Sequence, residues 1–335
     1  MTTERDPLLE VRELRTYVHL RSGTVRAVDG ATFSIRRGEA LALVGESGSG
    51  KSMTCQTIMR LEPRPAAAIE GGEILFEGEN LLGKTLAQMR HIRGRRIGMI
   101  LQDPLNSLNP VFTIGNQLVE AFRLSNPKAG RAELRGQASA ALERVGIRGA
   151  TGRLESYPFE FSGGMRQRVT AAIAMARRPA LLIADEPTTA LDVTTQARFL
   201  GLLDELRREN DMSLLLVTHD LGIVAQTCDR VAVMYAGRVV ETAATRQILE
   251  SPRHPYTQAL LRAVPHLDGP RMRRMFHISG EPPNARAQGM GCRFAPRCEF
   301  ARDACRSAYP PTLRYANGDS VACWLHVPEV PPAAS

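Results

Sequence analysis

The chain has 335 residues, which is long for one domain and favours a main domain with an appended part. An apolar share of 43% excludes a disordered chain, and charges throughout the first twenty residues argue against a secretion signal. No apolar run approaches the roughly 20 residues that span a bilayer, so we expect a soluble protein. The net charge of +8 is compatible with nucleic acid, an anionic membrane or polyphosphate ligands, although an aromatic content of 5% disfavours stacking on single-stranded bases.

Four short apolar runs predict strands of a parallel sheet that is covered by helices on both faces, because such strands read as near-continuous apolar stretches. Helical patterns at 51–61 and 194–210 lie between them, and this alternation is typical of an α/β core. The stretch 230–243 predicts a hairpin that turns at Ala236 and Gly237. The four apolar runs are 40–45, 97–102, 180–185 and 213–219.

Two parts of the chain depart from this alternation. From about Pro104 to Gly164 the sequence is helical and loop-like, which predicts a helical insert within the α/β domain. From about residue 262 the composition shifts to Pro, Arg and Cys with little periodicity. We therefore predict a main domain over residues 1–261, with the insert at about 104–164, and a C-terminal extension over residues 262–335.

The octapeptide GESGSGKS matches the phosphate-binding pattern G-x-x-x-x-G-K-[ST] between a predicted strand and a predicted helix. Its glycines allow backbone N–H groups to turn toward phosphates, and the following helix adds its positive end. Lys51 is expected to reach the β- and γ-phosphates, and Ser52 to ligate Mg²⁺. The predicted phosphate-binding residues are Gly45, Glu46, Ser47, Gly48, Ser49, Gly50, Lys51 and Ser52.

An acidic pair follows the third apolar run, in the sequence LLIADEP. Asp185 is expected to hold Mg²⁺, and Glu186 to face an attacking water as the general base. Such a pair at a strand end is otherwise a solvated turn or a helix cap. The complete phosphate loop upstream favours the catalytic interpretation.

Further short motifs resemble those of ABC-type ATPases. FSGGMRQR, from Phe161 to Arg168, resembles the signature motif of that family. LQDP resembles its Q-loop, TTALD its D-loop and VTHD its switch-histidine motif, and Tyr17 resembles the aromatic residue that stacks on adenine. The motifs occur in family order over roughly residues 10–240. The site residues that this resemblance adds are Tyr17, Gln102, Ser162, Gly163, Gly164, Asp192 and His219.

The resemblance implies a P-loop NTPase core with a parallel sheet, an antiparallel β subdomain and a helical insert that carries the signature motif. It also implies ATP and Mg²⁺ as ligands, with Gln102 near the metal and His219 near the γ-phosphate. Ser162, at the start of a helix, would contact ATP held by a second ATPase subunit. Two subunits would then close head to tail around two ATP molecules.

A narrower resemblance comes from FSGGM, HPYTQALL, SGEPPN and GCRFAPRC. These stretches are similar to those of peptide/nickel-type importer ATPases, the ATP-binding subunits of dipeptide and oligopeptide permeases. The implied partners are two membrane permease subunits, a second and related ATPase chain, and an external substrate-binding protein. The implied location is peripheral, on the cytoplasmic face of the membrane, while the transported substrate stays open.

Two other classes of function fit the sequence less well. A soluble ABC ATPase acting on DNA or ribosomes would carry a long coiled coil or two motif sets, and neither is present, so we expect no nucleic-acid partner. A nucleotide kinase or GTPase would leave the signature motif unexplained, and no N-K-x-D guanine motif occurs.

Four of the six cysteines, Cys292, Cys298, Cys305 and Cys323, lie in the extension with the spacing C-x5-C-x6-C-x17-C, whereas Cys55 and Cys228 are expected to be core thiols. Disulfides do not suit a cytosolic protein, and zinc sites usually show a close C-x₂₋₄-C pair. The tail resembles peptide-permease ATPases of which some carry a [4Fe–4S] cluster. We therefore predict an iron–sulfur cluster on the four cysteines, with zinc or four unliganded thiols as alternatives.

Overall fold

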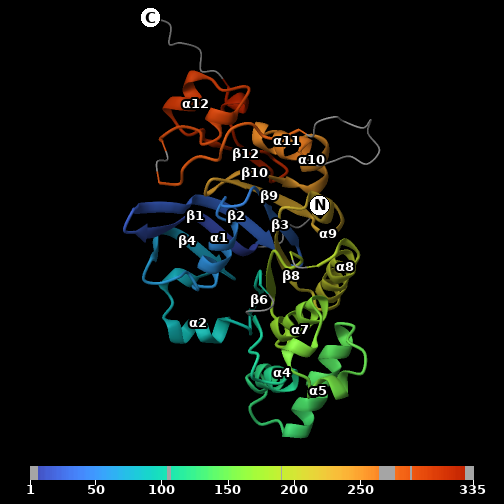
Figure 1. The fold of residues 1–335 in the computed structure, drawn as a ribbon. Coiled ribbons are helices and arrows are strands. Elements are labelled where there is room, and N and C mark those ends of the chain that lie inside the picture. The colour runs from blue at the N-terminus through green and yellow to red at the C-terminus, as the bar shows by residue number, and fades with distance from the viewer. Residues whose placement is uncertain (1–6, 104–106, 190, 264–275, 287–288, 329–335) are drawn as a thin grey trace, which may run out of the picture.

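The computed structural model describes residues 7–103, 107–189, 191–263, 276–286 and 289–328 (Figure 1). The start of the chain, the first residues of the predicted insert (104–106) and parts of the predicted extension (264–275, 287–288 and 329–335) lie outside the described residues. The strands are β1 (Pro7–Leu20), β2 (Gly23–Arg36), β3 (Ala40–Val44), β4 (Ala67–Phe76), β5 (Glu79–Asn80), β6 (Ile97–Ile100), β7 (Leu181–Asp185), β8 (Ser213–Thr218), β9 (Arg230–Tyr235), β10 (Arg238–Ala244), β11 (Thr312–Arg314) and β12 (Ser320–Ala322). The α-helices are α1 (Lys51–Ile58), α2 (Leu86–Ile92), α4 (Ile114–Arg123), α5 (Arg131–Arg144), α6 (Ala150–Arg153), α7 (Gly163–Met175), α8 (Val193–Glu209), α9 (Leu221–Thr227), α10 (Thr245–Glu250), α11 (Pro255–Arg262) and α12 (Asp303–Ser307).

The main sheet has the strand order β11-β12-β10-β9-β3-β8-β7-β6. Strand β3 pairs in parallel with β8 and β9, and β7 pairs in parallel with β8 and β6. The four apolar runs therefore form the parallel part of this sheet, as predicted. Parallel strands end at the same edge of a sheet, so the residues that follow β3, β6, β7 and β8 are brought to one edge.

The two faces of this sheet are covered by different layers because successive residues of a strand point to opposite faces. In β3, Ala40, Ala42 and Val44 join a core cluster with Phe199 and Leu203 of α8. Leu41 and Leu43 join a second cluster, which includes Cys55 and Ile58 of α1 and apolar residues of β1, β2 and β4. The predicted α/β fold is confirmed.

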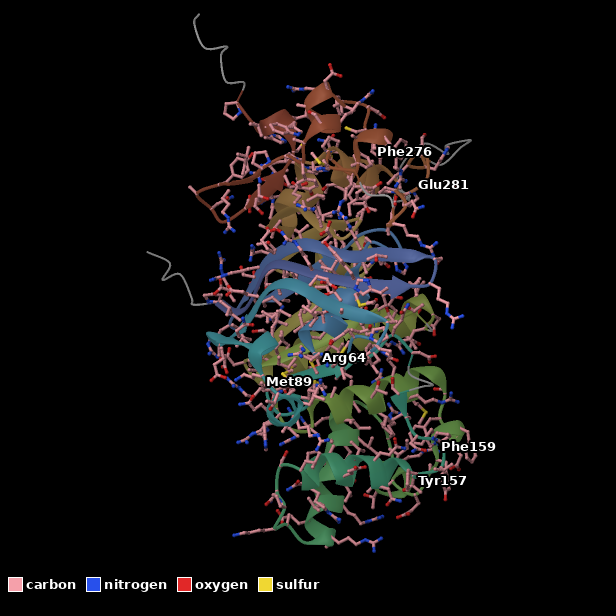
Figure 2. All side chains as sticks on the ribbon, turned by 90° about the vertical axis from the view of Figure 1, so that its left-hand side faces the viewer. Arg64, Met89, Tyr157, Phe159, Phe276 and Glu281 are labelled. Atoms are coloured by element: carbon pink, nitrogen blue, oxygen red, sulfur yellow. The ribbon has the colours of Figure 1, made fainter. Side chains whose placement is uncertain are left out.

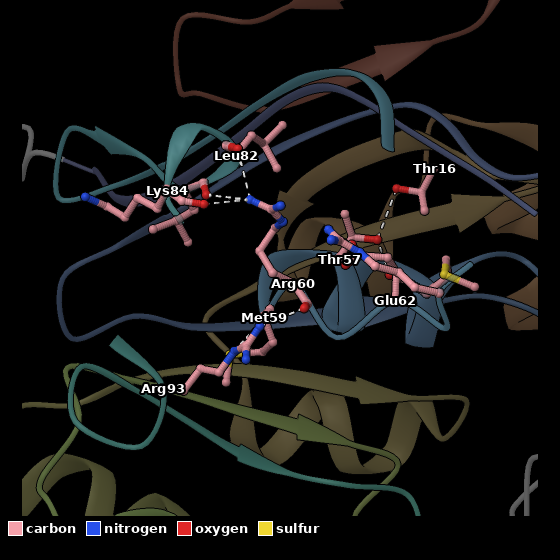
Figure 3. A network of polar contacts seen from close by, with 11 residues as sticks. Thr16, Thr57, Met59, Arg60, Glu62, Leu82, Lys84 and Arg93 are labelled. Atoms are coloured by element: carbon pink, nitrogen blue, oxygen red, sulfur yellow. Dashed lines mark hydrogen bonds and ion pairs between the residues drawn. The ribbon is translucent and has the colours of Figure 1, made fainter. Parts of the chain in front are cut away.

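A smaller antiparallel sheet, with the order β2-β1-β4-β5, packs against α1. The end of α1 is joined to this sheet and to the loop before β6 by the polar contacts in Figure 3. Arg60 donates to the carbonyl oxygens of Leu81 and Leu82 at 3.1 and 2.9 Å, and Arg93 donates to Met59 at 2.8 Å. Arg93 thus satisfies a carbonyl at the C-terminus of α1, and Arg60, just after that helix, ties it to the turn after β5.

The helical insert lies between β6 and β7 and has a core of its own. Ile114 and Leu118 of α4, Leu142 of α5, and Phe161 and Val169 at α7 are buried together. Figures 1 and 2 show the insert at one end of the molecule, with Tyr157 and Phe159, and the C-terminal part at the other end, with Phe276 and Glu281. Within the described ranges, no helix combines the length and apolar character that crossing a bilayer requires.

The C-terminal part continues the main sheet. The hairpin β9–β10 turns at Ala236 (φ 46°) and Gly237 (φ 86°), as predicted. Strand β12 then pairs antiparallel with β10, joining Glu241 to Val321, and β11 pairs with β12. The residues after 262 are therefore partly regular. Two three-residue strands attach them to the sheet, and the sequence pattern did not indicate either strand.

Candidate nucleotide-binding site

The phosphate loop connects β3 to α1 and passes close to two neighbouring backbones. A Cβ atom at Gly45 would lie 2.1 Å from the Met234 carbonyl oxygen, and one at Gly50 would lie 2.3 Å from that of Ala27. Both positions also have positive φ, so only glycine fits there. The buried Ser49 hydroxyl has no hydrogen-bond partner among the described residues, which leaves it available for a ligand oxygen.

Lys51 lies under this loop at the start of α1. Its ammonium donates to the carbonyl oxygens of Gly45 at 2.8 Å and Glu46 at 3.0 Å. Burial lowers the pKa of Lys51, while the nearby carboxylates of Glu186 and Asp185 act in the opposite direction. The lysine thus stands between the phosphate loop and the acidic pair.

Ser52 and Asp185 meet where α1 begins and β7 ends. The Ser52 hydroxyl donates to Asp185 Oδ1 at 3.0 Å. Burial raises the pKa of Asp185, the hydrogen bond from Ser52 opposes this rise, and the neighbouring Glu186 adds to it. A hydroxyl and a carboxylate at contact distance form an oxygen-donor pair of the kind that Mg²⁺ prefers.

Glu186 leaves the end of β7 with a left-handed backbone (φ 43°), a conformation rare for a residue with a side chain and frequent at functional sites. Its carboxylate accepts a hydrogen bond from Gln102 Nε2 at 3.2 Å. The second carboxylate oxygen lies 3.8 Å from Nδ1 of His219. Three predicted site residues, from the ends of β6, β7 and β8, are thus brought together.

The remaining predicted site residues make local contacts. Ser162 caps α7 by accepting from the Met165 N–H at 3.4 Å, and Asp192 caps α8 by accepting from the Thr195 N–H at 2.9 Å. Gly163 and Gly164 form the first turn of α7. The Tyr17 hydroxyl donates to Asp29 at 2.5 Å, and the Arg26 guanidinium lies 5.7 Å from the Tyr17 ring.

Sequence reasoning missed the residues that hold the loop at Glu46. The Glu46 N–H donates to the Tyr256 hydroxyl at 2.9 Å, and the Glu46 carboxylate accepts from both Nη atoms of Arg297 at 2.8 and 3.1 Å. Tyr256 belongs to the HPYTQALL stretch and Arg297 to GCRFAPRC. Both stretches carry the family resemblance, but their sequences do not indicate that they contact the phosphate loop.

The prediction of an iron–sulfur cluster on Cys292, Cys298, Cys305 and Cys323 is wrong. All four lie within the described residues as free thiols, and no group of three or more His, Cys, Asp or Glu in the described part of the chain could hold a metal ion, so zinc has no support either. Burial raises the pKa of Cys292 and Cys298, and raises that of Cys323 to about 11. Cys292 and Cys298 pack against the core cluster that contains Phe294. Cys55 and Cys228 are buried core thiols, as predicted.

Other contacts hold the extension in place of a metal. Phe294 is buried against the rings of Tyr235 and Tyr256, at centroid distances of 5.3 and 5.4 Å. Arg293 pairs with the buried Asp29, and Arg297 with Glu46. Together with the strand pairing of β12, these contacts order the extension, whose sequence pattern alone does not indicate an ordered structure.

A phosphate loop at the end of a parallel strand, an acidic pair on a neighbouring strand and a capped helix carrying FSGGM define an ATPase of the ATP-binding cassette class. The family model described as ABC transporter matches residues 28–189, and that of the oligopeptide/dipeptide transporter C-terminal region matches residues 240–305.

The sequences of similar proteins align with nearly the whole chain. The oligopeptide transport ATP-binding protein OppD of Bacillus subtilis is 45% identical over 324 residues, which is 97% of this chain and 90% of that protein. A probable peptide ABC transporter ATP-binding protein of Sinorhizobium fredii is 47% identical over 319 residues, which is 95% of each. A solved structure, a dimeric ATP-binding cassette in a post-hydrolysis state with ADP and Pi, has a TM-score of 0.64 at 25% identity, covering 71% of this chain and 99% of that chain.

The chain therefore belongs to the family of ABC transporter ATP-binding proteins, and it is an ATPase. The alternative of an ATPase acting on nucleic acid or ribosomes finds no support in these comparisons.

Proposed function

We propose that this chain binds ATP with Mg²⁺ at the edge of the main sheet and hydrolyses it to energise the import of dipeptides, oligopeptides or related substrates. The observation that carries the proposal is the meeting of Ser52, Asp185 and Glu186 beside the phosphate loop. The peptide class rests on the match of residues 240–305 and on the names of the relatives. We assign the activity to residues 1–261 and treat 262–335 as an extension of that domain.

The loop Gly45–Ser52 is proposed to hold the phosphates through its N–H groups and Lys51. Mg²⁺ would be held by Ser52 and Asp185, with the amide oxygen of Gln102 nearby, and their oxygen-donor chemistry fits this ion. When bound, the ion neutralises charge on the β- and γ-phosphate oxygens.

Glu186 is proposed to position the attacking water and to accept its proton. Gln102 orients the Glu186 carboxylate through the 3.2 Å hydrogen bond. His219, whose side chain is 68% exposed, lies on the other side of that carboxylate, where it can contact the γ-phosphate.

Ser162, Gly163, Gly164 and Asp192 are proposed to complete the ATP site of a second ATPase subunit. In support, α7 has 13 residues and starts at this motif, so its first N–H groups and positive end suit an anion. The dimeric ATP-binding cassette of similar fold supports pairing of two such chains. We propose that the second subunit is a related but distinct chain.

An apolar patch on the insert supports docking of permease subunits. Val111 and Phe112, and Tyr157 and Phe159, are exposed. The hydrogen bond from the Ile114 N–H to the Ser156 carbonyl oxygen, at 2.9 Å, brings the two segments together, and the rings of Tyr157 and Phe159 stack at 5.6 Å (Figure 2). Exposed apolar patches of this kind mark protein interfaces. We propose that this patch docks on the permease and holds the chain peripherally on the cytoplasmic face of the membrane. The proposed assembly contains two permease subunits and an external protein that delivers the substrate.

The docking proposal is tested with Phe159→Asp, which should release the chain from membranes when it is co-expressed with the permeases of its operon. Phe300→Asp is the matched control, since Phe300 is 50% exposed at the other end of the molecule and should leave the chain membrane-bound. Equal membrane association of both variants would contradict the patch as the docking surface.

The nucleotide site is tested with Lys51→Ala, which should abolish ATP binding, hydrolysis and peptide uptake while the protein stays folded. Lys128→Ala is the control, because Lys128 is exposed in the loop after α4. If Lys51→Ala bound ATP as tightly as the control did, the assignment of the phosphate site would be wrong. Loss of hydrolysis without loss of peptide uptake would contradict the energising role.

A further inference from the structure

A buried arginine of the extension, Arg297, contacts the phosphate loop. The Arg297 side chain is only 5% exposed, and its guanidinium donates to both oxygens of Glu46. It also donates to the Tyr235 hydroxyl at 3.2 Å and to the carbonyl oxygens of Ser279 and Ile278 at 3.1 and 3.2 Å. Burial acts to lower the pKa of Arg297, but the hydrogen bonds to Glu46 and Tyr235 raise it above its ordinary value, so the charge is kept.

Glu46 is the second residue of the phosphate loop, and the chain after residue 250 holds both its backbone and its side chain. Tyr256 binds the Glu46 N–H, and Arg297 binds its carboxylate. The Glu46 carbonyl oxygen in turn accepts from Lys51 at 3.0 Å. A continuous path of hydrogen bonds therefore runs from Arg297 through Glu46 to the lysine expected to bind the phosphates.

The contact between the loop and the extension is closely packed. A cavity of about 30 Å³ lies between Ser47 and Gly48 on one side and Pro282 and Pro283 on the other. It is far smaller than a ligand pocket, so the two segments leave little space between them. The Arg26 N–H also donates to the Ala285 carbonyl oxygen at 3.1 Å.

A second arginine of the extension, Arg293, contacts the part of the proposed ATP site that contains Tyr17. Arg293 pairs with the buried Asp29, which accepts the hydrogen bond from Tyr17. Between the two arginines, Phe294 is buried in the aromatic cluster with Tyr235 and Tyr256. The segment 293–297 is thus anchored at its centre and contacts both parts of the proposed ATP site.

We propose that Arg297 is a positioning residue for ATP, which holds the phosphate loop in its binding conformation through Glu46. The proposal rests on the proposed assignment of the loop as the phosphate site. A loop fixed before ATP arrives loses less conformational freedom on binding, so the contact favours affinity. Glu186 and His219 follow other strands, β7 and β8, and the chemical step should depend little on Arg297.

The test is ATP affinity and single-turnover hydrolysis of the full chain carrying Arg297→Ala, Arg297→Lys or Glu46→Gln. Removing a charged hydrogen-bond partner should weaken ATP binding by about tenfold, with a hydrolysis rate at saturating ATP within about twofold of wild type. Lysine keeps the charge without the two-pronged geometry and should restore affinity only in part. Arg262→Ala is the matched control, since its ion pair with Glu299 is exposed and lies within the same part of the chain.

A double-mutant cycle separates this role from general stabilisation. Arg297→Gln combined with Glu46→Gln should weaken binding by about tenfold, as each single change does, and not by about a hundredfold. If Arg297→Ala does not fold, Glu46→Gln tests the same contact from the loop side. Wild-type affinity in both Arg297→Gln and Glu46→Gln, or additive losses in the double variant, would overturn the proposal. If either result occurs while Lys51→Ala still loses ATP binding, the Arg297 proposal is wrong but the assignment of the phosphate site holds. If Lys51→Ala binds ATP as wild type does, the assignment of the phosphate site is wrong.

Discussion

The side-chain amide of Gln102 donates to the Glu186 carboxylate at 3.2 Å, although 84 positions separate the two residues along the chain. The contact is possible because β6 and β7 are parallel neighbours that end at the same edge of the sheet. Gln102 follows β6, the strand that leads into the helical insert. The contact therefore joins the start of the insert to the proposed general base. We therefore propose that a displacement of the insert would change the orientation of Glu186 through this contact.

Glu186→Gln should bind ATP with nearly unchanged affinity and lower the hydrolysis rate by about 10²–10⁴-fold, because an amide cannot accept a proton from water. ATP affinity and single-turnover rates measure the two effects separately. The assay should use a preparation in which Lys51→Ala abolishes hydrolysis. The measured turnover then comes from the ATP site of this chain. Glu209→Gln is the control, since Glu209 forms an exposed ion pair with Arg144. Equal rates in the two variants would show that Glu186 is not the base.

Tyr17→Ala should weaken ATP binding by about tenfold, because a base stacked on an aromatic ring contributes about 1–3 kcal/mol. Tyr17→Phe keeps the ring and loses only the hydrogen bond to Asp29, so its effect should be smaller. Tyr315→Ala serves as the control, because the Tyr315 ring lies against Arg253 in the C-terminal part of the chain. Competition with a fluorescent ATP analogue measures all three affinities, and wild-type binding by Tyr17→Ala would contradict the stacking role.

The parallel strands and the acidic pair could be predicted because both are local in sequence. Every residue of β3, β7 and β8 is buried, which requires the continuous apolar runs from which these strands were predicted. The phosphate loop likewise has its glycines where backbone atoms pass nearby. Such features need no knowledge of distant residues.

The features that could not be predicted depend on distant contacts. Strand β11 has the sequence TLR, which shows no usable alternation, and it pairs only through β12, which adds to the edge of β10. Glu46 is held by residues 210 and 251 positions away. The clustering of four cysteines and the family resemblance of the tail suggested a metal, because the sequence could not show that Phe294 and two arginines already order that segment.

Stability should depend on pH through His254, which is buried at the start of α11. Burial, with a smaller effect of His326, lowers the pKa of His254 to about 3. An unfolded histidine binds its proton below about pH 6.5, while the native one stays neutral, so the free energy of unfolding falls as pH drops from about 6.5 toward 3. This group alone should cost about 2 kcal/mol at pH 5.

His254→Asn tests this pH dependence, because an amide oxygen can still accept from the Tyr256 N–H while the titrating ring is removed. The variant should be less stable than wild type at pH 8, yet it should lose about 2 kcal/mol less between pH 8 and pH 5. Urea unfolding at the two pH values measures the difference. The exposed His91→Asn should follow wild type, and a pH dependence of His254→Asn equal to that of wild type would contradict the linkage.

Phe294→Ala should lower the free energy of unfolding by about 3–5 kcal/mol, because it empties the centre of the cluster formed with Tyr235 and Tyr256. Phe300→Ala, six residues later and half-exposed, should change it by less than about 0.5 kcal/mol.

The loss of stability in Phe294→Ala should be largest in the C-terminal part, so hydrogen exchange at β12 should rise in this variant before exchange in β3 or β7 does. Because Arg293 and Arg297 flank this phenylalanine, the same variant should also weaken ATP binding, whereas Phe300→Ala should not. Wild-type stability and exchange in Phe294→Ala would mean that the extension is held by something other than its aromatic anchor.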